Sequence, residues 1–364
     1  MFIILLVILL FIIVVIVFIN QPKFGKLPSG ERLATIEKSP NYKNGAFQNT
    51  SNTPALAEGE TYYNVLKTYL FADKSKAKPI QLLPAIKTNL YELDISRDVL
   101  VWFGHSSYYL QVDGKRILVD PVLSGSASPL PGGTKAFRGS DIYAVEDFPS
   151  IDYLFITHDH WDHLDYKTVV ALKEKVYVVI CGLGTGAHLE HWGYDKKYII
   201  EKDWNEAFDL DDGFYVNTVP ARHFAGRSFW RNKAIWMSYV LKTPTYNFFI
   251  GGDSGYDTHF ADIGKRFGPF DLTILENGQY NNSWKYIHMM PGEQLKAAVD
   301  LGARKLLPVH SSKFNLSLHD WDEPLKSIVM NNNTKVDIIT PMIGEPVWLD
   351  DPSQTFKKWW EEVN

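Results

Sequence analysis

The sequence has almost no cysteine and no tract of basic residues. Cys181 is the only cysteine among the 364 residues, so no intrachain disulfide can form. It ends the apolar run Val178–Cys181, which indicates a buried, unreactive thiol rather than a nucleophile. The net charge is −5, whereas a surface that binds nucleic acid needs clustered positive charge. The sequence therefore predicts that nucleic acid is not a partner.

Charged residues are also missing from the start of the chain. Phe2–Ile19 is an unbroken apolar run of eighteen residues, which as a helix extends about 27 Å and can just cross a bilayer. No basic residue precedes the run and no small-residue cleavage site follows it, so an uncleaved anchor is favoured over a signal peptide. Lys23, Lys26 and Arg32 follow the run, and the positive-inside rule then predicts a cytoplasmic catalytic portion on a single-pass membrane anchor.

A histidine-rich hexamer follows a predicted strand at Tyr153–Thr157. The hexamer reads HDHWDH and occupies positions 158–163. Because side chains alternate along an extended segment, His158, His160 and Asp162 can point to one side, with His163 at the following turn. Imidazole and carboxylate groups at one strand end suit zinc or a similar divalent ion. A solvated polar loop of the same composition is the alternative.

Further strands and a few helices surround this hexamer in the sequence. Asp113-Gly114 separates two apolar runs and predicts a hairpin. No tandem repeat of the kind that builds solenoids is present. This order of elements predicts stacked sheets with helices outside, an α/β class. The predicted strands are Val99–Gly104, Tyr108–Val112, Arg116–Val119, Val178–Cys181, Phe214–Val219, Trp236–Leu241, Asn247–Gly251, Leu272–Leu275 and Lys305–Pro308, and the predicted helices are 60–71, 167–175 and 292–301.

Three more candidate metal ligands stand at the ends of predicted strands. They are His223, Asp253 and His310. Each by itself is equally well explained as a polar residue that caps a strand. Together with the hexamer they give five histidines and two aspartates, which is what two adjacent metal ions need if one carboxylate bridges them and positions remain open for water.

Longer motifs give these residues a family context. The chain resembles the metallo-β-lactamase superfamily, whose H-x-H-x-D-H motif stands here as HDHWDH. More narrowly, it is similar to the N-acyl-phosphatidylethanolamine-hydrolysing phospholipase D family. This resemblance implies an α/β fold, an αβ/βα sandwich with the metals at one edge of the paired sheets. The similarity extends from FGKLPSGER at Phe24 to the His310 region and includes WFGHSS, DPVLSGSASP, FITHDHWDHLD, PARHFAGR, GGDSGY, IGKRFGPFDL and HMMPGE.

The resemblance also implies roles for single residues. His158, His160 and His223 match the ligands of one zinc, Asp162, His163 and His310 match those of the second, and Asp253 matches the bridging residue. The implied cofactor is thus two Zn²⁺, or another divalent transition metal. Asp162 and His288 are the expected catalytic residues, although His288 before Pro291 can also be a plain helix-start residue. His105 and Asp120 are expected to orient ligands. The stretch Leu275–Asn281 departs from the family pattern.

The resemblance implies a function at the membrane. The expected reaction is hydrolysis of N-acyl-phosphatidylethanolamine-like phospholipids to phosphatidic acid and N-acylethanolamine by hydroxide held between the two ions. A lactonase or ester hydrolase of the same superfamily is the runner-up, and a non-catalytic, membrane-tethered metal-binding protein is the third hypothesis. The predicted division is an anchor at 1–20, a wrapping segment at 21–94, a hydrolase domain at 95–350 and a tail at 351–364. The expected partners are the phospholipid substrate and the lipid bilayer, with the oligomeric state left open.

Overall fold

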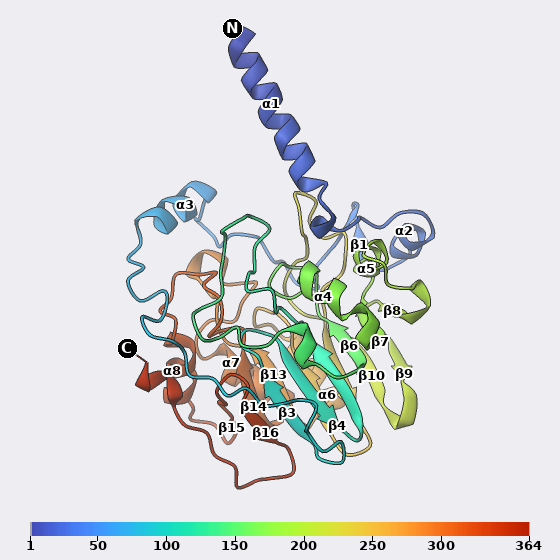
Figure 1. Ribbon diagram of the computed structural model, residues 1–364, viewed down its shortest axis with the longest axis vertical. Helices are drawn as coiled ribbons and strands as arrows, with labels where there is room; N and C mark the ends of the chain where they lie inside the picture. Colours follow the sequence, from blue (N-terminus) through green and yellow to red (C-terminus); the bar gives the residue numbers. More distant parts are fainter. Residues whose placement is uncertain (1, 364) are drawn as a thin grey trace.

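The computed structural model describes residues 2–363, and two seven-stranded sheets form its centre (Figure 1). The sheet orders are β16-β3-β4-β5-β6-β7-β8 and β15-β14-β13-β12-β11-β10-β9. The first sheet contains β3 (Val99–Trp102), β4 (Tyr108–Val112), β5 (Lys115–Val119), β6 (Ile151–Ile156), β7 (Val176–Gly182), β8 (Ile199–Lys202) and β16 (Pro346–Trp348). The second contains β9 (Ala207–Asp209), β10 (Tyr215–Val219), β11 (Ser238–Lys242), β12 (Asn247–Ile250), β13 (Phe270–Glu276), β14 (Ala303–Val309) and β15 (Asp337–Ile338).

Both sheets are mixed, and their central strands are buried on both faces. Strands β5 to β8 are parallel, as are β12 to β15. Along β3, Leu100 and Trp102 belong to the buried cluster between the sheets, while Val99 and Val101 belong to the cluster on the outer face. Burial of both faces explains why these strands are near-continuous apolar runs in the sequence.

Helices cover the two outer faces and complete a four-layer sandwich. Val169 of α4 (Tyr166–Leu172) and Leu189 of α5 (Gly186–His191) pack in the cluster outside the first sheet. Phe260 of α6 (His259–Phe267), Leu295 of α7 (Glu293–Leu301) and Ile328 of α8 (Glu323–Met330) pack outside the second. The predicted αβ/βα sandwich is therefore confirmed.

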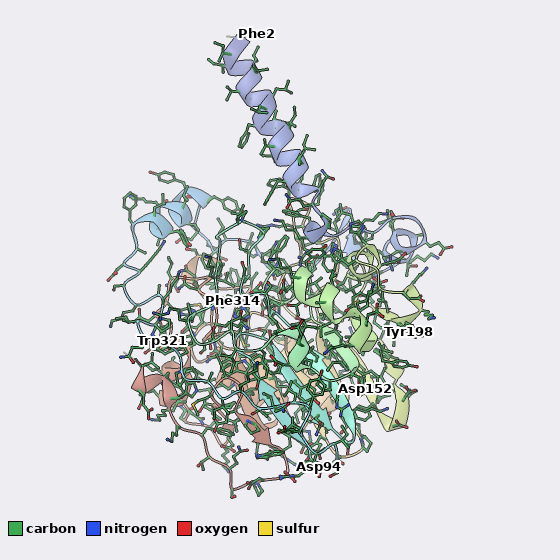
Figure 2. All side chains as sticks on the ribbon, in the orientation of Figure 1. Phe2, Asp94, Asp152, Tyr198, Phe314 and Trp321 are labelled. Carbon is green, nitrogen blue, oxygen red and sulfur yellow. The ribbon has the colours of Figure 1, made fainter. Side chains whose placement is uncertain are left out.

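The first helix stands apart from this sandwich. Helix α1 (Phe2–Ile19) projects from one end of the body, and its side chains point outward along most of its length (Figures 1 and 2). None of its residues is buried. It is long and apolar enough to cross a membrane, as the sequence predicts.

The segment after α1 wraps around the sandwich. It contains α2 (Gly30–Ile36), the small hairpin β1 (Tyr42–Lys43) and β2 (Ala46–Phe47), and α3 (Tyr62–Phe71). Arg32 forms an ion pair with Glu201 at 2.7 Å. The Leu83 amide donates to the Arg138 carbonyl at 2.8 Å. These contacts reach distant parts of the sandwich, so the segment is an integral layer of the fold.

The end of the described chain also joins the core. Trp359 and Trp360 are each 1% exposed and belong to the same buried cluster as the inward side chains of the two sheets. The Trp359 indole donates to the Pro341 carbonyl at 3.2 Å. Residues beyond 350, which the sequence analysis separates as a tail, thus close one side of the core.

Candidate metal centre

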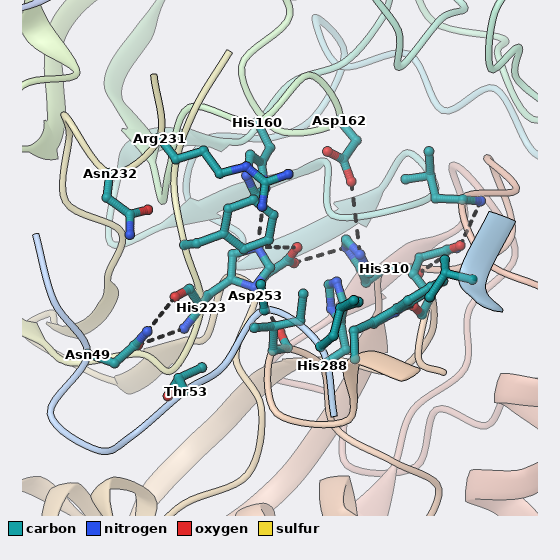
Figure 3. A pocket seen from close by; sticks show the side chains of 18 of the residues that line it. Asn49, Thr53, His160, Asp162, His223, Arg231, Asn232, Asp253, His288 and His310 are labelled. Carbon is teal, nitrogen blue, oxygen red and sulfur yellow. Dashed lines mark hydrogen bonds and ion pairs between the residues drawn. The ribbon is translucent and has the colours of Figure 1, made fainter. Parts of the chain in front are cut away.

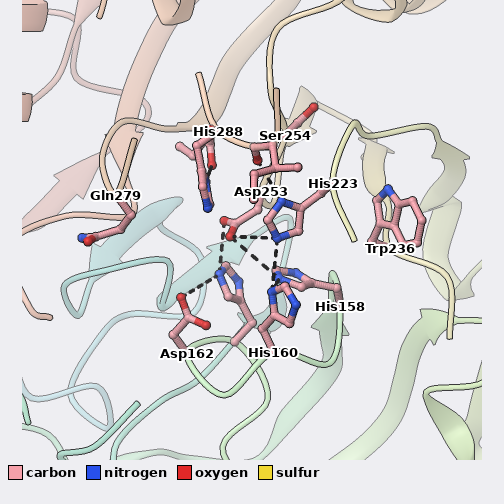
Figure 4. Close-up of polar contacts among 12 residues, drawn as sticks. His158, His160, Asp162, His223, Trp236, Asp253, Ser254, Gln279 and His288 are labelled. Atoms are coloured by element: carbon pink, nitrogen blue, oxygen red, sulfur yellow. Dashed lines mark hydrogen bonds and ion pairs between the residues drawn. The ribbon is translucent and has the colours of Figure 1, made fainter. Parts of the chain in front are cut away.

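The structure brings all seven predicted metal ligands together at one edge of the two sheets. His158, His160, Asp162 and His163 follow β6 of the first sheet. His223, Asp253 and His310 come after β10, β12 and β14 of the second sheet, three strands that run in the same direction. The side chains converge between the sheets, as Figure 4 shows. The metal centre is therefore a property of the paired sheets and not of the hexamer alone.

Three imidazoles form the first group of donors. The Nε2 atoms of His158 and His223 lie 2.9 Å and 3.2 Å from Nδ1 of His160. Oδ2 of Asp253 faces the same group, 3.8 Å from His158 Nε2 and 3.6 Å from His223 Nε2. These four residues offer ligand atoms that all lie within 4.8 Å of one another.

The second group shares Asp253 with the first. Oδ1 of Asp253 lies 3.1 Å from His163 Nε2 and 3.0 Å from His310 Nδ1. Asp162 completes this group, with its Oδ2 atom 3.6 Å from His163 Nε2. Asp253 thus presents one oxygen to each group, which is the geometry of a bridging carboxylate.

Neighbouring polar residues fix the ligand rings. Asp120 accepts hydrogen bonds from the Thr157 amide at 2.8 Å and from Nδ1 of His163 at 2.8 Å. His105 Nε2 lies 2.9 Å from Oδ2 of Asp162. His223 donates from Nδ1 to the Ile287 carbonyl at 2.8 Å, which leaves its Nε2 with a lone pair toward the other donors. His105 and Asp120 therefore stand in the orienting positions that the sequence predicts.

Burial dominates the electrostatics of the site. Burial and the neighbouring imidazoles hold the pKa values of His158 and His223 well below the usual range. Burial also lowers the pKa of His160, to about 4, and raises that of Asp253, to about 6. Burial opposes the charged form of His163 as well, but Asp253 and Asp162 raise its pKa well above the ordinary value. Most of the imidazoles are therefore neutral at physiological pH and can act as metal ligands.

The donor atoms fit divalent metal ions. Among the described residues, His160 Nε2, His163 Nε2 and Asp253 Oδ1 are buried without a hydrogen-bond partner. Buried polar atoms normally have a hydrogen-bond partner, so several unpartnered atoms at one place indicate that a ligand binds there. Nδ1 of His160 carries at most one proton and cannot donate well to both His158 Nε2 and His223 Nε2, so the three converging nitrogens leave lone pairs for a cation. Mixed imidazole and carboxylate donors are those that zinc prefers.

His288 lies beside the seven residues but has a different partner. Its Nδ1 atom is 2.6 Å from Oε2 of the buried Glu276, and its ring centroid is 5.0 Å from that of His223 and 5.2 Å from that of His310. Burial raises the pKa of Glu276 well above the ordinary value. Glu276 therefore orients the His288 ring at the rim of the metal centre.

A cavity of about 430 Å³ opens above the metal donors (Figure 3). Its floor contains His160, Asp162, His223, Asp253 and His310, together with His288. The rest of its lining is mainly apolar, with polar side chains that come chiefly from loops. These other lining residues are Asn49, Thr53, Ala55, Leu56, Tyr62, Val65, Phe224, Arg231, Asn232, Gln279, Trp284, Ile287 and Leu316.

Several residues of the site are absent from the sequence analysis. Asn49, in a predicted loop, exchanges hydrogen bonds with the backbone of His223 at 2.8 Å and 3.1 Å. Ser106 lies 2.9 Å from His310 Nδ1. Arg231 lines the cavity, with its guanidinium 4.9 Å from the Phe224 ring centroid. The motif WFGHSS contains Ser106, but no sequence pattern marks Asn49 or Arg231.

The two other residues of the hexamer have structural tasks. Asp159 accepts a hydrogen bond from the Gly226 amide at 2.6 Å and lies 3.2 Å from His188 Nε2. Trp161 packs against Phe24 and under the Arg227 guanidinium. The hexamer thus presents metal donors on one side. On the other side, Trp161 contacts Phe24 in the segment that follows α1.

Three comparisons with known proteins show the family and the fold of this chain. A family model described as a beta-lactamase superfamily domain matches residues 115–311. An uncharacterized protein of Mycobacterium tuberculosis (strain ATCC 25618 / H37Rv) is 37% identical over 337 residues, which are 90% of this chain and 89% of the relative. The mitochondrial N-acyl-phosphatidylethanolamine-hydrolyzing phospholipase D of Saccharomyces cerevisiae is 32% identical over 240 residues, 63% of this chain and 50% of the relative. The solved structure of Igni18, a metallo hydrolase from Ignicoccus hospitalis KIN4/I, aligns with a TM-score of 0.53 and a sequence identity of 20%. The alignment covers 69% of this chain and 97% of the Igni18 chain, so the two proteins share a fold.

Proposed function

Because the chain belongs to the metallo-β-lactamase superfamily, we propose that it is a dinuclear zinc phosphodiesterase that hydrolyses N-acyl-phosphatidylethanolamine-like phospholipids. The reaction is of phospholipase D type and yields phosphatidic acid and an N-acylethanolamine. The family match and the yeast relative support a metallo-hydrolase related to such phospholipases.

The two-sided arrangement around Asp253 is the observation on which this proposal rests. Asp253 faces His158 and His223 with one oxygen and His163 and His310 with the other. Two zinc ions held by these groups supply Lewis acidity, which lowers the pKa of a bound water and neutralises charge on phosphoryl oxygens. We assign His158, His160 and His223 to one ion and Asp162, His163 and His310 to the other.

His288 is proposed to handle the leaving group. When a water oxygen attacks phosphorus, the bond between phosphorus and the ethanolamide oxygen breaks, and that oxygen needs a proton. His288 lines the cavity, and Glu276 holds its Nδ1 atom. Because burial raises the pKa of the Glu276 carboxyl, Glu276 is protonated in this proposal and donates to Nδ1, so His288 carries its own proton on Nε2 and can donate it to the leaving oxygen as a general acid. Asp162 is proposed to orient the attacking water, since it lines the cavity floor among the donors.

The lining of the cavity supports a lipid substrate over a lactone. Arg231 supplies a cation at the wall, suited to a phosphodiester anion. Leu56, Val65, Ile287 and Leu316 supply apolar surface opposite the polar floor. A small lactone has neither a negative charge for Arg231 nor acyl chains for that wall, so both features favour a phospholipid.

The anchor gives such a substrate direct access to the site. We propose that α1 spans the membrane and that the basic residues after it, Lys23, Lys26 and Arg32, keep the hydrolase domain in the cytoplasm. A site tethered at the bilayer meets phospholipid without extracting it far into water. In sealed vesicles of known orientation, protease should reach the domain only where the cytoplasmic face is outside.

Product analysis in labelled water tests the reaction. Purified protein is incubated with a phospholipid panel in water enriched in oxygen-18, and both products are analysed by mass. Attack on phosphorus should place the label in phosphatidic acid and none in the ethanolamide. Label in the ethanolamide, or transfer of the phosphatidyl group to added short-chain alcohol through an enzyme intermediate, contradicts this mechanism. Turnover of lactones with none on any phospholipid supports the lactonase hypothesis instead.

Two variants connect the reaction to the site. Asp253→Asn should lose most of the bound metal and the activity, because it removes a charged bridge between the two groups of donors. Asp262→Asn is the matched control, since Asp262 is exposed on α6. Elemental analysis of the active protein should show close to two zinc-like ions per chain. Active protein without any transition metal would refute the dinuclear proposal.

A further inference from the structure

Helix α3 exposes nearly all of its large apolar side chains. No residue of this helix is buried, and six of its side chains are between 47% and 81% exposed. The surface of a soluble protein seldom exposes so much apolar area on one short helix unless that helix binds a protein, a ligand or a membrane. The six are Tyr62, Tyr63, Leu66, Tyr69, Leu70 and Phe71.

The helix lies at the end of the molecule from which α1 projects. Figure 1 shows α3 at the level where α1 leaves the body, and Figure 2 shows the side chains of α3 standing outward there. A bilayer crossed by α1 would therefore have its surface at the height of α3.

Two loops beside the end of α1, one containing Leu130 and the other residues 227–230, also expose apolar side chains. Lys23, just after α1, donates from Nζ to the Pro129 carbonyl at 2.7 Å, and its own carbonyl accepts from Arg227 at 2.9 Å. These contacts place both loops at the foot of α1. The first loop exposes Leu130 and the second exposes Phe229 and Trp230. Both loops thus carry exposed apolar side chains at the foot of α1, at the end of the molecule where α3 also lies.

The charges on this end suit phospholipid headgroups. Lys67 and Lys74 accompany the apolar side chains of α3, and the Lys74 ammonium lies 3.6 Å from the Tyr69 ring centroid. Lys23, Lys135 and Lys167 line a separate cavity near the foot of α1. Basic groups interspersed with aromatic rings are typical of the boundary between headgroups and acyl chains.

The same helix borders the cavity above the metal donors. Tyr62 and Val65 of α3 line that cavity, and so does Arg231 from the loop that exposes Phe229 and Trp230. The mouth of the site is therefore flanked by the exposed apolar surface.

We propose that α3 and the 226–232 loop lie in the interfacial layer of the bilayer, beside the α1 span, and admit a phospholipid sideways into the cavity. The contact with the bilayer is independent of the reaction, whereas the admission of substrate rests on the proposed function. The helix has the composition of an interfacial element, with aromatic and leucine side chains beside lysines. Its apolar surface is covered by lipid in this arrangement and not by a second protein.

Site-specific labelling of the full chain tests the contact. The native Cys181 is buried, so an introduced cysteine can be labelled selectively with an environment-sensitive nitrobenzoxadiazole dye. Phe71→Cys in α3 is compared with Met330→Cys in α8, because both side chains are 81% exposed at the end of a helix. Figure 1 shows α8 in the part of the body away from α1. The labelled proteins are reconstituted into phosphatidylcholine–phosphatidylglycerol vesicles, with and without nitroxide-labelled acyl chains.

The dye at position 71 should show blue-shifted emission that the nitroxide lipids quench strongly, while the dye at position 330 should show water-like emission without quenching. Water-like emission at both positions would overturn the proposal. A blue shift at position 71 that the nitroxide lipids do not quench would also overturn it, since another protein or a second copy of this chain would then cover α3.

A second measurement tests the admission of substrate. Leu66→Asp combined with Leu70→Asp puts two charges on exposed positions of α3 that do not line the cavity. Hydrolysis of phospholipid in vesicles should fall by about tenfold or more, because charged groups are costly in the acyl layer. Hydrolysis of detergent-dispersed phospholipid should stay unchanged. Equal loss in both assays, or no loss in vesicles, would refute sideways admission. Absence of hydrolysis by the unmodified protein would refute the proposed function and leave the labelling result standing.

Discussion

At the scale of single residues, the metal centre depends on backbone positions that most side chains avoid. His105, Asp120 and His310 all have positive φ angles, of 52°, 41° and 65°. Such conformations cost of order 1–3 kcal/mol each and persist where the surrounding structure enforces them. Here hydrogen bonds do so: the His105 amide donates to the Ser311 carbonyl and the His310 amide to the His105 carbonyl, both at 2.9 Å. Two site residues thereby hold each other in place.

Gly252, just before Asp253, allows a close approach between the sheets. Its φ angle is +60°, and a Cβ atom there would lie 2.8 Å from Cβ of Thr157. Gly252→Ala should therefore lower the free energy of unfolding by about 2–4 kcal/mol and disturb metal binding. Chemical denaturation of the detergent-solubilised protein measures the effect. Gly114→Ala is the matched control, because its φ angle is +76° and no atom lies within 4 Å. Equal losses in both variants would show that the contact with Thr157 has no influence.

His105 should matter for metal affinity although it is outside the set of seven ligands. Its Nε2 atom lies 2.9 Å from Oδ2 of Asp162 and orients that carboxylate. His105→Ala should weaken metal binding by about 10–100-fold, as is usual when an orienting partner is lost. Titration with a competing chelator measures this, and added zinc should restore part of the activity. His191→Ala, at an exposed position of α5, should bind metal normally. Unchanged affinity in His105→Ala would contradict the orienting role.

At the scale of elements, α1 is separable from the rest of the fold. It has no buried residue, and none of its residues is near the metal donors. At its end, Phe18 forms an edge-to-face pair with Phe24, with centroids 5.3 Å apart, and its ring centroid lies 4.6 Å from the Lys23 ammonium. The hydrolase sandwich therefore does not need α1 for its own packing.

Deletion of Phe2–Ile19 should change the kind of membrane attachment. If α1 spans the membrane as proposed, the full chain should resist extraction by alkaline carbonate, because its eighteen apolar residues would lie in the acyl layer. The shortened chain should be extracted and should still hydrolyse detergent-dispersed phospholipid at an unchanged rate. Sedimentation of membranes followed by immunodetection measures the distribution. Full chain that is extracted as easily as the shortened one would contradict the anchor.

At the scale of the whole molecule, segments far apart in sequence close the sandwich. The stretch after α1 contributes Asn49 to the support of His223, and the last described residues contribute Trp359 to the core. Neither segment belongs to the region 115–311 that the family model matches. The fold of the domain therefore extends, at both ends, beyond the region that the family model matches.

Trp359→Ala tests this closure. The indole is 1% exposed and packs near Trp321 with ring centroids 6.3 Å apart, so its removal leaves a large cavity. The free energy of unfolding should fall by about 3–5 kcal/mol. Trp230→Ala is the matched control, since that side chain is 52% exposed and should cost little. Urea denaturation followed by circular dichroism measures both. A small loss in Trp359→Ala would mean that the last segment is not part of the core.

The sequence by itself determined the sandwich class and the long central strands. All ten predicted strands are present, because strands buried on both faces are apolar throughout and stand out from their polar surroundings. Short edge elements did not stand out. β8, β9, β15 and β16 each have four residues or fewer, and β8 and β9 have no buried residue, so they lack a pattern that distinguishes them from loops.

The candidate ligands were also recognisable from the sequence, because each follows the apolar run of a strand and all except His310 lie within a quoted family motif. Only the tertiary structure brings the side chains of these candidate ligands together. Asp253 and His163 are ninety positions apart in the chain, and only the pairing of the two sheets puts their side chains 3.1 Å apart. The same holds for Asn49, Glu276 and Arg231, whose neighbours in sequence are unremarkable. Their roles arise from contacts between distant segments, and no local pattern encodes such contacts.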